Sequence, residues 1–115
     1  MPPRDVRTYL SDILASIVEI ESAVVGVDLP AYEATRAVRS RVEREFMIVG
    51  EALRQLLDSE PKLEERITAA PAIIGFRNHL VHGYFLIANA TVWDIIHGHL
   101  PALKREVESL AAEYR

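Results

Sequence analysis

The sequence TRAVRSRVEREFMIVGEALRQLLDS, residues 35–59, carries apolar side chains at steps of three and four residues. They are Val38, Val42, Phe46, Val49, Leu53, Leu56 and Leu57. This spacing gathers them on one face of an α-helix, and most of the remaining residues are good helix formers. We therefore expect the longest helix of the chain at residues 35–59, closed by Pro61, with an apolar face that other helices must cover.

The segment before it repeats the pattern. Apolar residues recur at helical spacing from Val6 to Val24, which predicts a helix over residues 5–25. Gly26 suits the C-terminal cap of that helix, and Pro30 disfavours helical geometry at Leu29. We expect the helix to stop there.

Two further helices follow the central one. After a short helical turn at residues 62–67, Pro71 is placed as a first-turn residue for a helix over residues 72–82, ended by Gly83. A last helix is expected from near Thr91, with Asn89 as its cap and a kink at Pro101. Its apolar side is Leu103, Val107, Leu110 and Ala111.

These elements predict the fold class. No strand-like alternation of apolar and polar residues competes with the helices, and 115 residues are enough for one core. We expect an all-α protein with a single domain over residues 1–115: an antiparallel four-helix bundle with a kinked last helix.

Composition limits the function classes. The chain has no cysteine, which excludes disulfides, thiolate metal sites and a cysteine nucleophile, and which fits a reducing compartment. With 13 Lys and Arg against 17 Asp and Glu, its formal charge is −4, so any bound anion must be met by a local cluster of cations. The charged N-terminus is not typical of a signal peptide, and the longest uncharged stretch, residues 78–93, contains polar side chains that are costly in a membrane. We expect a cytoplasmic protein with no membrane association.

One segment stands out for its charge. Between Arg66 and Asp94, residues 67–93 contain a single formally charged side chain, Arg77, within GFRNHLVHGYF. Asn78 and His82 are four residues apart and share a helix face, whereas Arg77 lies about 140° from His82. A twofold axis would help Arg77 and His82 to converge, because it would bring a second copy of the helix alongside.

These residue types suit RNA cleavage. Arg77 offers a planar fork of donors to a phosphate, Asn78 can hold a phosphate oxygen or a base edge, and a histidine can exchange a proton near neutral pH. A base would deprotonate the ribose 2′-hydroxyl, Arg77 would stabilise charge on the phosphoryl oxygens, and an acid would protonate the leaving 5′-oxygen. No metal is required for this chemistry.

The motif also resembles that of a known family. RNHLVHGY, residues 77–84, looks like the Arg-x4-His-x-Tyr signature of the HEPN superfamily, and specifically of HepT-like toxins. Three further blocks resemble that family in the same order: RDVRTYLSDILASIVEIE near the N-terminus, residues 43–56 around IVGEALRQL, and VWDIIHGHLPALKREVE at residues 92–108. The resemblance covers about nine-tenths of the chain.

The resemblance implies a function. It points to the toxin of a type VII-like toxin–antitoxin module: a cytoplasmic, all-helical homodimer that cleaves RNA as a metal-independent endoribonuclease and needs no cofactor. Carried over to this sequence, Arg77 is the phosphate-binding group, His82 the general acid or base, and Asn78 a polar helper. The partner is a minimal nucleotidyltransferase antitoxin (MntA-like), which forms a hetero-oligomer with the toxin and AMPylates the motif tyrosine, here Tyr84.

Other interpretations of these residues stay open. Arg77 could be a structural residue paired with Glu51 or Glu43, and His82 could only favour the C-terminal end of its helix. We expect Glu51 to orient Arg77, because Gly50 leaves room for close helix approach. The chain could also be a non-catalytic HEPN module that binds nucleotide or a partner protein, or a plain helical interaction domain.

Two further side-chain patterns are open to interpretation. Asp94 and His97 have the spacing of a metal-binding pair, but the second Glu-x-x-His motif of a di-iron bundle is missing. Arginines 36, 39, 41 and 44 are interleaved with glutamates, which is typical of a solvated face. Arg36 and Arg39 could extend a path for RNA.

Overall fold

The computed structural model describes residues 5–82 and 88–115. Within these ranges every regular element is helical, which confirms the all-α prediction. The elements, in chain order, are α1 (Val6–Val24), α2 (Leu29–Ala34), α3 (Arg36–Ser59), the 3₁₀ helix η1 (Pro61–Arg66), α4 (Ala70–His82), α5 (Asn89–Gly98) and α6 (Leu100–Glu113).

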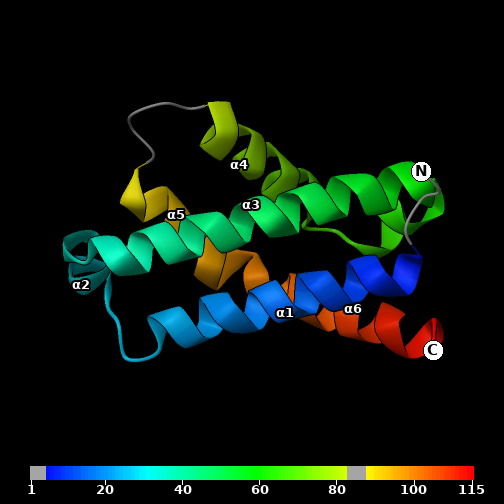
Figure 1. The fold of residues 1–115 in the computed structure, drawn as a ribbon, viewed down its shortest axis with the longest axis horizontal. Coiled ribbons are helices and arrows are strands. Elements are labelled where there is room, and N and C mark those ends of the chain that lie inside the picture. Colours follow the sequence, from blue (N-terminus) through cyan, green and yellow to red (C-terminus); the bar gives the residue numbers. More distant parts are fainter. Residues whose placement is uncertain (1–4, 83–87) are drawn as a thin grey trace.

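The helix α3 organises the bundle. It lies antiparallel to α1 and is also in contact with α4, α2 and η1 (Figure 1). The apolar stripes expected on α1 and α3 form the core, together with one face of α6. The fully buried residues of this core include Leu10, Ile13, Ile17, Ile20, Val42, Phe46, Val49, Leu53, Leu56, Leu103, Val107 and Leu110. The apolar faces predicted for the first, central and last helices therefore form the core.

The predicted ends of the first helix agree with the structure to within one residue. Asp5 caps α1 by accepting a hydrogen bond from the backbone N–H of Arg7 at 2.8 Å. Gly26 has a φ of +71°, a conformation that glycine adopts without strain and that ends the helix.

The short helix α2 was not predicted. Pro30 was interpreted as a stop, but it lies in the first turn of α2, where a proline needs no backbone N–H. Asp28 caps this turn by accepting a hydrogen bond from the N–H of Ala31 at 2.9 Å. Tyr32 on α2 is fully buried, and its ring centroid lies 5.4 Å from that of Trp93 on α5. The α2 turn therefore closes one end of the core.

The predicted last helix is broken into two. The break falls at His99, between α5 and α6, and Pro101 lies in the first turn of α6. Asn89 is the first residue of α5 and not its cap, which is Ala88. A proline was correctly expected to interrupt the helix, but the interruption falls two residues before it, because the proline begins the next helix.

None of the described helices is long and apolar enough to cross a membrane.

Candidate functional site

The site residues gather where α4 crosses α3. Phe46 and Phe76 meet edge to face in this contact, with centroids 5.3 Å apart. At Gly50 the backbones approach so closely that a Cβ built there would lie 2.2 Å from Cβ of Arg77 and 2.6 Å from its Cγ. A residue with a side chain at position 50 would therefore displace the helix that carries Arg77.

This close approach places the Arg77 guanidinium beside Glu51, the residue that follows Gly50 on α3. Nη2 of Arg77 lies 2.9 Å from Oε2 of Glu51, and Nη1 donates a hydrogen bond of 3.0 Å to Oδ1 of Asn78. The Arg77 side chain is 22% exposed. Its Nε is buried and has no hydrogen-bond partner. A guanidinium has five N–H donors, so donors remain on both terminal nitrogens for a ligand.

Glu51 is held from both sides. Its Oε1 accepts hydrogen bonds from Nη2 of Arg54 at 2.5 Å and from Nε2 of Gln55 at 2.8 Å. Arg54 also donates to Asp58 at 3.0 Å. The hydrogen bonds from Arg54 and Gln55, with the charges of Arg54 and Arg77, lower the pKa of Glu51 to about 2. The carboxylate is therefore ionised at neutral pH and fixes the position of Arg77.

Sequence reasoning missed Arg54 and Gln55. The signal was present, because residues three and four positions after Glu51 project from the same face of a helix. These two side chains hydrogen-bond to Oε1 of Glu51, while Arg77 lies beside its Oε2.

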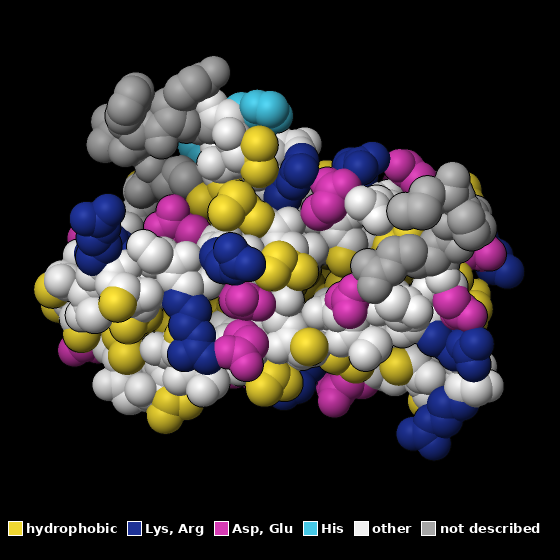
Figure 2. All heavy atoms as spheres, viewed as in Figure 1, with side chains coloured by type: hydrophobic (Ala, Val, Ile, Leu, Met, Phe, Trp, Pro, Cys, Tyr) yellow, Lys and Arg dark blue, Asp and Glu magenta, His cyan; other side chains and the backbone are white. Residues whose placement is uncertain are grey.

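His82 is the last residue of α4 and is exposed, as are Asn78 and His79. Figure 2 shows histidine side chains in cyan over α4, on the face of the molecule that also carries the α3–α4 contact. Within the described part of the chain, no hydrogen bond joins Arg77 to His82. One copy of the chain thus brings Arg77, Asn78 and Glu51 together, and leaves His82 facing outward. Tyr84 lies outside the described residues.

The sequence left Glu43 open as an alternative carboxylate partner for Arg77. Glu51, and not Glu43, is the carboxylate beside Arg77. Burial raises the pKa of Glu43, which the nearby charge of Arg39 opposes.

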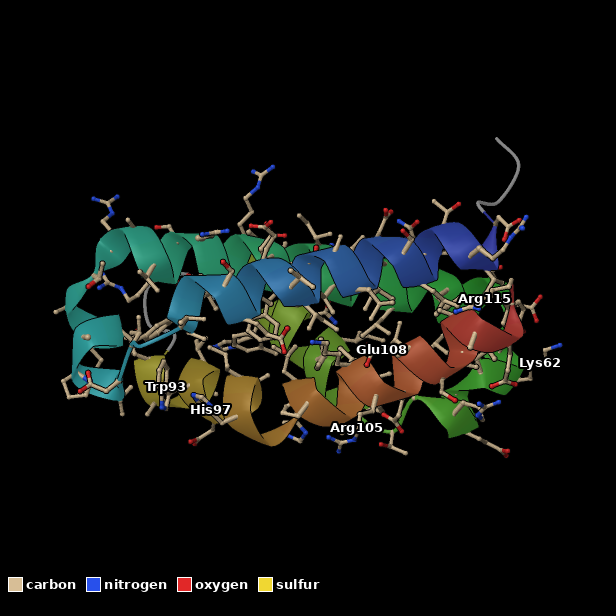
Figure 3. The ribbon with its side chains drawn as sticks, turned by 90° about the horizontal axis from the view of Figure 1, so that it is seen from below. Lys62, Trp93, His97, Arg105, Glu108 and Arg115 are labelled. Atoms are coloured by element: carbon tan, nitrogen blue, oxygen red, sulfur yellow. The ribbon has the colours of Figure 1, made fainter. Side chains whose placement is uncertain are left out.

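The residues of the rival metal pair lie on α5. His97 packs its ring against Trp93, with centroids 4.6 Å apart (Figure 3). No group of three or more metal-ligating side chains occurs among the residues that the structure describes.

The chain is similar to proteins of known classification. The family model described as "Ribonuclease HepT-like" matches residues 13–110. The Methanocaldococcus jannaschii protein named "Putative RNase MJ1380" is 32% identical over 110 residues, which cover 94% of this chain and 98% of that protein. The Thermococcus cleftensis protein named "Probable ribonuclease HepT" is 25% identical over 107 residues, which cover 93% of this chain and 96% of that protein. No solved structure matches significantly.

Proposed function

The chain belongs to the HepT-like ribonuclease family, and from that premise we propose that it is a metal-independent endoribonuclease that works as a homodimer. The observation that carries the proposal is the placement of Arg77. Its guanidinium is partly exposed at the edge of the α3–α4 contact, fixed by Glu51 and Asn78, five residues before an exposed histidine at the helix end.

The proposed reaction is an internal transfer within RNA. A histidine takes the proton of the ribose 2′-hydroxyl, and that oxygen forms a bond to the adjacent phosphorus. The bond from phosphorus to the 5′-oxygen breaks, and a separate group acts as the acid and donates a proton to the leaving 5′-oxygen. The products are a 2′,3′-cyclic phosphate and a free 5′-hydroxyl. The free donors of Arg77 stabilise the charge that grows on the phosphoryl oxygens.

A dimer supplies what one copy lacks. The reaction needs a base and an acid, and each chain offers one motif histidine, His82, on the exposed end of α4. Two copies of α4 related by a twofold axis would place two His82 side chains around one RNA strand, with the Arg77 groups beside them.

The proposed regulation acts next to this site. A minimal nucleotidyltransferase antitoxin would AMPylate Tyr84, two residues after His82 in the sequence. The added nucleotide carries negative charge and bulk, which would exclude an RNA strand.

Cleavage of RNA in the presence of EDTA tests the proposal. Protein made without an antitoxin should cut a single-stranded RNA, leave DNA of the same sequence intact and yield 2′,3′-cyclic phosphate ends. The His82→Ala variant should lose cleavage and keep the dimer, as measured by light scattering, while His79→Ala is the matched control from the same helix turn. If the wild type leaves RNA whole and still binds nucleotide, the chain is a non-catalytic binding module.

A further inference from the structure

Four arginines fall within the first nine residues of α3, and the structure divides them into two kinds. Arg41 forms an ion pair with Glu19 on α1, and Arg39 donates a hydrogen bond to the backbone carbonyl of Glu33. Arg36 and Arg44 are exposed and have no carboxylate partner among the described residues. Their charges are thus not neutralised within the chain.

The local sequence leaves Arg44 without a helix-face partner. The positions three and four residues away on either side are Ser40, Arg41, Met47 and Ile48, none of them acidic. The first turn of α3 has no acidic residue, and Thr35 makes no side-chain capping bond. Cations at the N-terminal end of a helix oppose the helix dipole and reduce stability. The helix dipole therefore does not favour a cation at Arg36, and its charge is available to a ligand.

The direction of the helices connects these arginines to the site. At 100° per residue, Arg44 lies about 20° from Glu51 around the α3 axis and about 10 Å before it. Figure 1 shows α4 crossing α3 at an incline, with its C-terminal end directed toward the half of α3 that begins at Arg36, so the step from Arg77 to His82, about 7.5 Å along α4, leads toward the same half of α3 as the step from Glu51 to Arg44. Figure 2 shows basic side chains on this half of α3.

We propose that Arg36 and Arg44, which we name the arginine track, bind the phosphates of the RNA strand that flank the scissile bond. The inference rests on the proposed function and extends the same site along α3. A strand held at Arg77 and passing His82 reaches Arg44 first, and it reaches Arg36 by crossing α3, because Arg36 lies about 80° from Arg44 around the axis and about 12 Å before it. The contacts are to the backbone, so the track increases affinity for longer RNA and does not read bases.

Two double variants with the same net charge test the track. Arg36→Gln with Arg44→Gln removes the track, and Arg39→Gln with Arg41→Gln removes the two arginines that are bound within the chain. Both double variants are made in the His82→Ala background, which is expected not to cleave RNA. Binding of a labelled single-stranded RNA 12-mer is then measured over a range of salt concentrations. For the track variant we expect the slope of log affinity against log salt to fall by about 1.4, since each lost phosphate contact removes about 0.7. The control should change far less.

Kinetics and folding complete the test. With His82 present, the track variant should raise KM for the 12-mer more than tenfold and keep kcat within twofold, and its Tm should not fall. If wild type cuts RNA and the two double variants behave alike, or if kcat falls with KM unchanged, the track is wrong and the proposed function stands. If the wild type does not cut the RNA and the His82→Ala protein does not bind it, the proposed function fails and the track fails with it.

Discussion

Gly50 on α3 lies directly against Arg77 on α4, with room for a hydrogen atom and none for a methyl group. The contact sets both the spacing of the two helices and the height of the Arg77 guanidinium above Glu51. It links a backbone property of one helix to the chemistry carried by the next.

Replacing this glycine should damage both stability and cleavage. Gly50→Ala brings a Cβ within 2.2 Å of Arg77 Cβ, so α4 must shift. Overpacking costs about 1–3 kcal/mol, of which the helix propensity of alanine offsets about 1 kcal/mol. We expect a lower urea midpoint and little RNA cleavage.

Gly75 on α4 provides the matched control. A Cβ built there meets nothing within 4 Å, so Gly75→Ala should raise stability by up to about 1 kcal/mol and leave cleavage unchanged. Equal cleavage by the two variants would show that the spacing of the helices does not govern the site.

The second prediction concerns the charge of Glu51. Its pKa is lowered from 4.5 to about 2, so its contribution to stability is complete above pH 4.5 and is lost as the pH falls toward 2. At pH 7 the Glu51→Gln variant should therefore be less stable than wild type. The difference in unfolding free energy between the two proteins should narrow steadily between pH 4.5 and pH 2, as measured by urea unfolding. A difference that is the same at pH 7 and pH 2.5 would contradict the ion-pair network.

The sequence predicted much of the fold because the long amphipathic helices carry redundant signals. Seven apolar positions on α3 define its buried face, and the loss of any one would not change the interpretation. Short elements lack that redundancy. The six residues of α2 are too few for a periodic pattern, and Pro30 is compatible with either a stop or a start. The Asp28 cap and the packing of Tyr32 against Trp93 show that it begins a helix here.

The candidate site, like the fold, could be predicted from the sequence only in part. Gly50 next to Glu51 suggested a close helix contact beside Arg77, because a missing side chain is visible in the sequence. Glu51 was expected to orient Arg77 for that reason, and the register of α4 against α3, which is a tertiary property, places Glu51 and not Glu43 beside it. The ion pair of Arg41 with Glu19 on α1 could not be predicted from sequence either, since it joins two helices whose register is a tertiary property.

The third prediction concerns Tyr84. Protein produced together with its nucleotidyltransferase should be heavier by one or more AMP units, and peptide mapping should place them on Tyr84. The modified protein should not cleave RNA. Tyr84→Phe should show no added mass and should stay active beside the antitoxin. Tyr114, on the described C-terminal segment, is the control tyrosine, and AMP on Tyr114→Phe protein should be undiminished.

The fourth prediction tests whether the site is shared between copies. If the two His82 side chains of a dimer serve one RNA strand as base and acid, a dimer with one His82→Ala chain lacks one of them and is inactive. Unfolding and refolding an equal mixture of wild type and His82→Ala makes half of the dimers mixed and a quarter of them wild type, so about a quarter of the cleavage by the same total amount of wild type should remain. Mixing the two folded proteins without subunit exchange is the control, and about half of the cleavage should remain there. If about half also remains in a mixture shown to contain mixed dimers, each site uses the His82 of one chain only, and a second His82 has no part in catalysis.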